Sequence, residues 1–142
     1  MKMISHRGNL YGPDLERENH PDYITEAIDA GYDVEIDVWY LDNEYWLGHD
    51  NPQYKTNLKF LKNRRLWCHA KNLAAMEILY KNEIHCFWHE SDKRVFTSKG
   101  YIWTYPDRAV CSRSVIVCHD KNKFDKINCF GICTDYVLEE PS

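Results

Sequence analysis

The sequence predicts an α/β fold, which we interpret as a reduced TIM-like (β/α) barrel with several helices shortened or missing. Short apolar stretches with strand-like alternation recur along the whole chain, and segments with helical periodicity separate the first of them. The chain has 142 residues, whereas a standard (β/α)₈ barrel takes about 250. The alternative is an open α/β sheet that carries the same polar residues at its strand ends.

Strands are predicted wherever apolar side chains alternate with polar ones or run together between turn residues. In chain order they are Met3–His6, Val34–Leu41, Glu44–Leu47, Leu66–Ala70, Ile84–His89, Tyr101–Tyr105, Ser114–His119 and Gly131–Val137, with a weaker strand at Val95–Thr97. Within the second strand the aliphatic side chains alternate with Glu35 and Asp37. The two acids therefore share one face of that strand.

A hairpin is predicted between the second and third strands. Asp42-Asn43 is a suitable two-residue turn. Such a turn would place Asp37 opposite Gly48 and Ile36 opposite His49. His49 should therefore lie beside the acidic pair.

Three helical segments are predicted between the strands. The first begins at Asn19-His20-Pro21, with proline near the first helical position, and ends at Gly31. A short helical turn falls at Leu58–Lys62, and Asn72 can cap a helix over Leu73–Tyr80. Helices are lacking chiefly after residue 84, which should leave the outer apolar face of the later strands bare. We therefore expect a protein partner or a second copy, in a homo-oligomer, to cover it.

Bulk composition restricts the class of protein. With 44% hydrophobic residues, residues 1–142 form a single domain with a real core. The net charge of −4 and the lack of a basic stripe argue against a nucleic-acid partner. No apolar run approaches the roughly 18 residues of a membrane span. The chain passes from Lys2 directly into a strand, so we expect no removable signal peptide and a cytoplasmic location. The six cysteines form no Cys-x-x-Cys pair and are expected to be free, mostly buried thiols.

Charged and polar residues gather at four places in the first fifty residues, namely His6-Arg7-Gly8, Glu18-Asn19, Glu35-Ile36-Asp37 and Gly48-His49-Asp50. Two histidines can serve as the acid and base of a hydrolysis. Two carboxylates on one strand face can hold a divalent cation through oxygen. An arginine beside a histidine suits a phosphate. Together these residues predict metal-assisted cleavage of a phosphodiester.

In this order the four segments resemble the glycerophosphodiester phosphodiesterase family, within the phosphatidylinositol-specific phospholipase C-like phosphodiesterases. That family has His-Arg-Gly at the end of strand one, Glu-Asn before the first helix, Glu-x-Asp at the end of strand two and His-Asp soon after. The resemblance is dense up to about residue 71. It implies a phosphoric diester hydrolase with a small phosphodiester substrate and one divalent metal ion. Mg²⁺ or Ca²⁺ is the preferred ion, with Mn²⁺ as the alternative.

The resemblance also implies roles for individual residues. His6 and His49 would be the acid–base pair, with His6 the base and His49 the acid, although the reverse assignment stays open. Arg7 would bind a phosphate oxygen; its structural alternative is a salt bridge to Glu18. The supporting residues would be Glu18, Asn19 and Asp50. For Asn19 the alternative is a helix cap.

By the same resemblance, Glu35 and Asp37 would bind the metal. The family's third ligand is a Glu two residues before a Lys; this chain has His69 at that position and keeps Lys71, which suits phosphate charge. On its strand His69 shares a face with Lys71, opposite the small Cys68. We therefore expect His69 to join the two acids and to shift the metal preference toward Mn²⁺ or Zn²⁺. The alternative is a two-carboxylate site completed by water.

Later residues give weaker indications. His89 and Asp135 end strands and are minor site candidates, and Tyr101, Trp103 and Tyr105 share a strand face that is better explained as core. Two other functions stay open: a non-catalytic module that binds a phosphorylated sugar or a phospholipid head group, and a His-rich structural zinc module, for which the spacings are poor.

Overall fold

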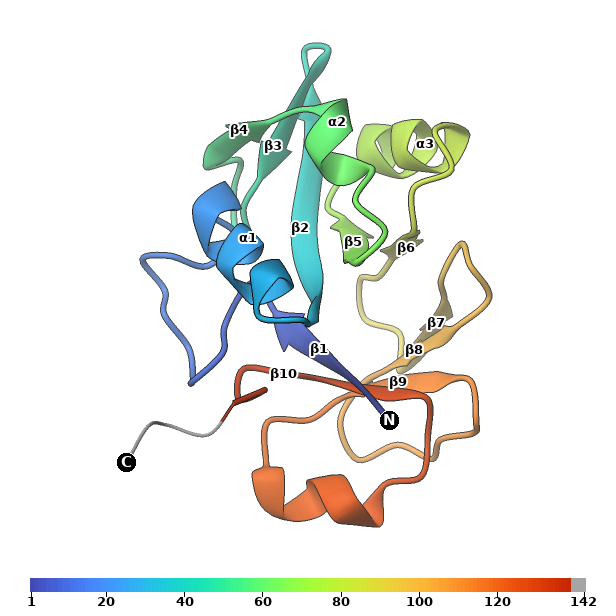
Figure 1. The fold of residues 1–142 in the computed structure, drawn as a ribbon. Helices are drawn as coiled ribbons and strands as arrows, with labels where there is room; N and C mark the ends of the chain where they lie inside the picture. The colour runs from blue at the N-terminus through green and yellow to red at the C-terminus, as the bar shows by residue number, and fades with distance from the viewer. Residues whose placement is uncertain (139–142) are drawn as a thin grey trace.

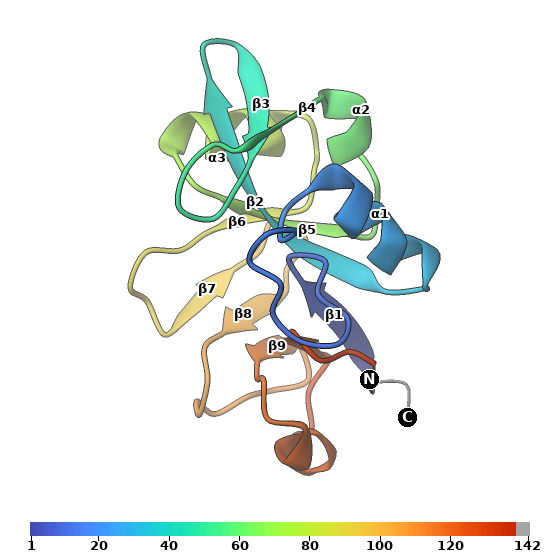
Figure 2. The same cartoon turned by 90° about the vertical axis from the view of Figure 1, so that its left-hand side faces the viewer.

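The computed structural model describes residues 1–138, which form a mixed α/β fold built on one strongly curled sheet (Figures 1 and 2). Seven strands in this range run parallel: β1 (Lys2–His6), β2 (Asp33–Leu41), β5 (Leu66–Ala70), β6 (Cys86–Trp88), β8 (Ile102–Thr104), β9 (Ser114–Val117) and β10 (Gly131–Thr134). Their spatial order is β6-β5-β2-β1-β10-β9-β8. The first and last strands of the chain are therefore neighbours at the centre of the sheet.

Antiparallel strands extend this parallel core: β3 (Glu44–Leu47), β4 (Tyr54–Thr56) and β7 (Arg94–Phe96). The strand β7 pairs with β8 at one edge of the curl, and β6 forms the other edge. Ser98, just after β7, donates its backbone N–H to the carbonyl of Cys86 in β6 at 2.8 Å. The two edges of the curl are thus tied together.

Helices cover only one part of the sheet. Figure 1 shows all three α-helices beside β2, β5 and β6, whereas the part containing β8, β9 and β10 has a single 3₁₀ helix. Their bounds are α1 (Pro21–Asp29), α2 (Leu58–Leu61), α3 (Leu73–Lys81) and η1 (Lys121–Lys126). Each α-helix is capped at its start by a side chain that accepts a hydrogen bond from a backbone N–H of the first turn. The capping residues are His20, Asn57 and Asn72.

The core has two layers. Aliphatic side chains of β2 and β5 pack outward against the α-helices, with Cys68 and Ala70 beside Ala75 and Leu79 of α3. Inside the curl, larger side chains fill the space between the strands; these are Ile4, Trp67, Phe87, Trp103, Val115 and Cys133. This packed interior lies directly beneath the carboxyl ends of the strands, so it can hold the side chains at those ends rigidly.

The predicted hairpin is confirmed, including its register. Val38 pairs with Leu47, and Gly48 donates its N–H to the carbonyl of Asp37 at 3.1 Å. Asp42 and Asn43 both have positive φ, 51° and 63°, as a type I′ turn requires.

Several features differ from the sequence predictions, and the strands predicted at Ile84–His89 and Gly131–Val137 are shorter, spanning Cys86–Trp88 and Gly131–Thr134. The strand β4 and the helix η1 were not predicted, because neither has a clear apolar period. The strand predicted at Ser114–His119 ends at Val117, since the side chain of His119 rather than its backbone bonds Asp135. The sequence predicted a bare outer face for the later strands, and this is wrong for β9 and β10. Residues in and around η1 cover that face, and Ile132 is fully buried there.

Candidate active site

A cavity of about 290 Å³ opens at the carboxyl ends of the parallel strands. Its lining includes most of the sequence-predicted site residues, namely His6, Arg7, Glu35, His49, His69 and Lys71. The register places these strands side by side: His6 pairs with Glu35, and Asp37 pairs with His69. The curled sheet therefore brings the chemistry-bearing residues of β1, β2 and β5 to one place.

Asp37 is buried and densely contacted. Its Oδ2 accepts a hydrogen bond from Nδ2 of Asn19 at 2.9 Å and lies 3.3 Å from Nε of Arg7 and 3.5 Å from Nδ1 of His49. Burial alone would raise the pKa of Asp37, but the neighbouring His49, His69 and Arg7 hold it well below its usual range. These neighbours therefore favour the ionised form of Asp37.

Glu35 has the opposite environment. It is 4% exposed, and its nearest basic groups are Nε2 of His6 and Nδ1 of His69, each at 3.9 Å. Burial, and then the charge of Asp37, raise the pKa of Glu35. Oε1 of Glu35 and Oδ1 of Asp37 are buried without a hydrogen bond. Neither oxygen receives a hydrogen bond, and both can therefore serve as ligands to a divalent cation, which prefers carboxylate oxygens.

His69 points toward these acids. Its Nδ1 lies 3.2 Å from Oδ1 of Asp37, and its ring stacks on Phe87 with centroids 5.1 Å apart. Its Nε2 lies 3.3 Å from the carbonyl oxygen of His89. A carbonyl oxygen can only accept, so Nε2–H donates to it. Nδ1 faces the two acids, and the hydrogen bond and charge of Asp37 raise the pKa of His69. Nδ1 is therefore the nitrogen that would bind a metal ion, in place of a proton. A second hydrogen bond of this kind commonly fixes the tautomer of a metal-binding histidine.

The residues present therefore fit a divalent metal ion. One ligand atom each from Glu35, Asp37 and His69 lie within 4.8 Å of one another. Two oxygens and one imidazole nitrogen form a donor set that suits Mn²⁺ as well as harder ions.

His6 forms a pair with a carboxylate that comes from the far end of the chain. Its Nδ1 lies 2.7 Å from Oδ1 of Asp135, so Nδ1–H donates and Nε2 faces Glu35. Burial opposes the charged ring, but the hydrogen bond to Asp135 and the charge of Glu35 raise the pKa of His6 overall. A histidine held by a carboxylate with its other nitrogen free is arranged as a proton acceptor.

Arg7 links several of the predicted residues. Its Nη1 lies 3.1 Å from Oε1 of Glu18 and its Nη2 lies 2.7 Å from Nδ1 of His49. Arg7 has φ +59°, and its backbone bonds Glu35 on one side and Asn19 on the other. The predicted alternative for Arg7, the salt bridge to Glu18, is present beside its contact with the cavity.

Asn19 is not the helix cap, because His20 occupies that position. Its amide instead binds Asp37 twice: Oδ1 accepts the backbone N–H of Asp37 at 3.0 Å, and Nδ2 donates to the carboxylate. Asp50 stays on the surface with its side chain 91% exposed, 3.7 Å from Nε2 of His49.

Two residues of the network were missed by sequence reasoning. Asn9 is fully buried and donates from Nδ2 to Oε2 of Glu18 at 3.0 Å and to Oδ1 of Asp135 at 2.9 Å. His119 lies against Asp135 and beside His6. Neither follows a periodic pattern; their only signal was position, one just after His6-Arg7-Gly8 and one at a strand end.

Three of the weaker candidates line the cavity, namely His89, Trp103 and Tyr105. The rings of His89 and Tyr105 stack with centroids 3.9 Å apart. Trp103 is 2% exposed and belongs to the interior cluster, against which Tyr101 and Tyr105 pack.

Comparison with family models, with curated proteins and with solved structures finds no match to this chain. Among residues 1–138, no helix has the length and apolar character needed to cross a membrane.

Proposed function

We propose that this protein is a metal-dependent phosphoric diester hydrolase of the glycerophosphodiester phosphodiesterase type, on a reduced TIM-like barrel. The observation that carries the proposal is the convergence of two buried, unbonded carboxylate oxygens with Nδ1 of His69, directly beside the free nitrogen of His6. The parallel strand order and the tie between β6 and β7 support the barrel.

Glu35, Asp37 and His69 would hold the metal ion, which would supply positive charge to a phosphate oxygen. Lys71 and Arg7 line the same cavity and would add charge to the other phosphate oxygens as negative charge builds up.

His6 would remove the proton from the nucleophile. With Nδ1–H donated to Asp135, its Nε2 accepts the proton of a water or of a neighbouring substrate hydroxyl, and the Asp135 carboxylate stabilises the ring when it becomes charged. His49, at the opposite side of Arg7, would protonate the departing alcohol oxygen. Attack by a substrate hydroxyl would give a cyclic phosphate, and attack by water a monoester.

The proposal is tested with bis(p-nitrophenyl) phosphate after EDTA treatment and after addition of Mg²⁺, Ca²⁺ or Mn²⁺. We expect turnover only with metal, and little on the monoester p-nitrophenyl phosphate. Metal-dependent binding of glycerophosphodiesters without turnover would favour the head-group-binding module instead. Absence of metal binding by calorimetric titration would overturn the site assignment.

A further inference from the structure

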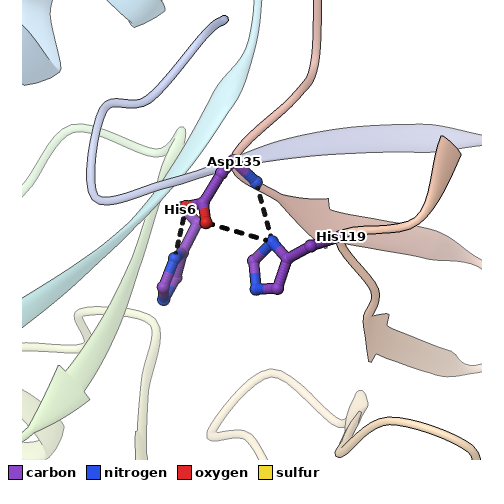
Figure 3. A group of neighbouring side chains, drawn as sticks. All are labelled: His6, His119 and Asp135. Atoms are coloured by element: carbon purple, nitrogen blue, oxygen red, sulfur yellow. Dashed lines mark hydrogen bonds and ion pairs between the residues drawn. The ribbon is translucent and has the colours of Figure 1, made fainter. Parts of the chain in front are cut away.

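His119 is a partly exposed histidine that the proposed mechanism leaves unused. It follows β9, its side chain is 36% exposed, and its ring centroid lies 5.2 Å from that of His6. Both rings meet the same residue, Asp135 (Figure 3).

The hydrogen bonds give the two rings opposite tautomers. The backbone N–H of Asp135 donates to Nδ1 of His119 at 3.0 Å. A backbone amide always keeps its proton, so Nδ1 supplies the lone pair and the ring proton lies on Nε2. In His6 the carboxylate of Asp135 accepts from Nδ1–H, which leaves the lone pair on Nε2. In Figure 3 the Nε2 atoms of both rings lie on the side away from Asp135.

The same three residues are close enough to be considered as metal ligands, but their hydrogen bonds argue otherwise. Nδ1 of His119 already accepts an N–H, and Oδ1 of Asp135 accepts from both His6 and Asn9. The buried oxygens without a hydrogen bond belong instead to Glu35 and Asp37. Oδ2 of Asp135 lies 3.3 Å from Nδ1 of His119. The hydrogen bonds of this group leave Nε2 of His6 as an acceptor and Nε2–H of His119 as a donor.

An acceptor and a donor on rings whose centroids lie 5.2 Å apart match one chemical group, the hydroxyl, which has both an O–H and a lone pair. We propose that Nε2–H of His119 donates to the oxygen of the nucleophilic hydroxyl while that hydroxyl donates its own proton to Nε2 of His6. The inference rests on the proposed function and names a further residue that touches the reacting oxygen. During attack the oxygen forms its bond to phosphorus, its proton passes to His6, the bond to the leaving oxygen breaks, and that oxygen takes a proton from His49.

Two variants of His119 separate a hydrogen-bond donor from a space-filling ring. His119→Phe keeps a ring without a donor, and His119→Gln places an amide N–H near the position of Nε2. We expect kcat for the diester to fall about tenfold in His119→Phe with KM nearly unchanged, and to recover largely in His119→Gln. Thermal unfolding of both variants reports whether the fold is kept. A kcat within twofold of the parent in folded His119→Phe, or equal losses in both variants, would overturn the proposal.

Two further measurements do not need turnover. Long-range ¹H–¹⁵N spectra should show His119 as the Nε2–H tautomer, and a proton on Nδ1 would sink the idea. The attacking oxygen becomes a phosphate oxygen of the product, so inorganic phosphate with Mg²⁺ should bind several-fold more weakly to His119→Phe than to the parent or to His119→Gln. If the parent cleaves no diester, the proposed function fails, whereas these two results still decide whether His119 donates to a bound oxygen.

Discussion

Neutralising Glu35 should stabilise the metal-free protein, whereas neutralising Asp37 should destabilise it. Glu35 is 4% exposed, its Oε1 has no hydrogen bond, and the basic groups of His6 and His69 lie 3.9 Å from its carboxylate. Leaving such a group unsatisfied costs about 1–3 kcal/mol. We therefore expect Glu35→Gln to raise the free energy of unfolding by about 1–2 kcal/mol, or the melting temperature by roughly 3–8 °C.

Asp37→Asn serves as the matched control. Its carboxylate is contacted by Asn19, Arg7 and His69. Removing one partner of such a buried charge cluster typically costs about 3–5 kcal/mol. The two neighbouring acids should thus give shifts of opposite sign, although both substitutions remove one negative charge from the same site.

The assay is thermal unfolding at pH 8 in EDTA and again with Mn²⁺. A ligand at a hundred times its Kd stabilises a protein by about 2.7 kcal/mol, so the parent should gain strongly from Mn²⁺ and both variants little. The reasoning would be refuted if Glu35→Gln unfolded below the parent in EDTA, or if it gained as much as the parent from Mn²⁺.

Three other predictions use the same protein. His6→Ala and His49→Ala should each lower diester turnover by about 10² or more without a change in circular dichroism. Parent-like turnover in either variant would contradict the two-histidine mechanism. The control is His85→Gln, a substitution outside the site cavity. His69→Glu should keep a metal site but move its preference from Mn²⁺ toward Mg²⁺ or Ca²⁺ in calorimetric titrations; an unchanged order of metals would show that His69 is not a ligand. Burial and the charge of Lys99 lower the pKa of His85 to about 4. The unfolded chain then takes up this proton first, so stability should fall by ~2 kcal/mol from pH 7 to pH 5, and urea unfolding of His85→Gln should lack that part of the loss.

Local signals predicted the acid-bearing part of the site. The turn at Asp42-Asn43 set the register that brings His49 to Asp37, because two adjacent residues decide it. The side of β5 on which His69 lies followed from alternation, since Cys68 had to pack under α3.

The remaining contacts depend on which strands close the sheet, which no local pattern encodes. Asp135 reaches His6 only because β10 pairs with β1, across 129 positions of sequence. The role of Asn9 could not be predicted from the sequence for the same reason, because one of its two carboxylate partners is Asp135. Asn19 was predicted as a supporting residue or a cap, and only the fold shows its amide on Asp37.

The uneven helical cover has a consequence for how the molecule loosens. The proposed metal ligands lie on β2 and β5, beneath α1 and α3, whereas Asp135 directly follows β10, in the part covered by residues in and around η1. Regions with fewer packed layers open at lower free energy, as separate cooperative units. Transient opening of the β8–β10 part would release His6 from its carboxylate while Glu35, Asp37 and His69 stayed in register. The protein would then pass through a state that still captures a cation but has lost its oriented base, so the capacity to bind would outlast the capacity to react.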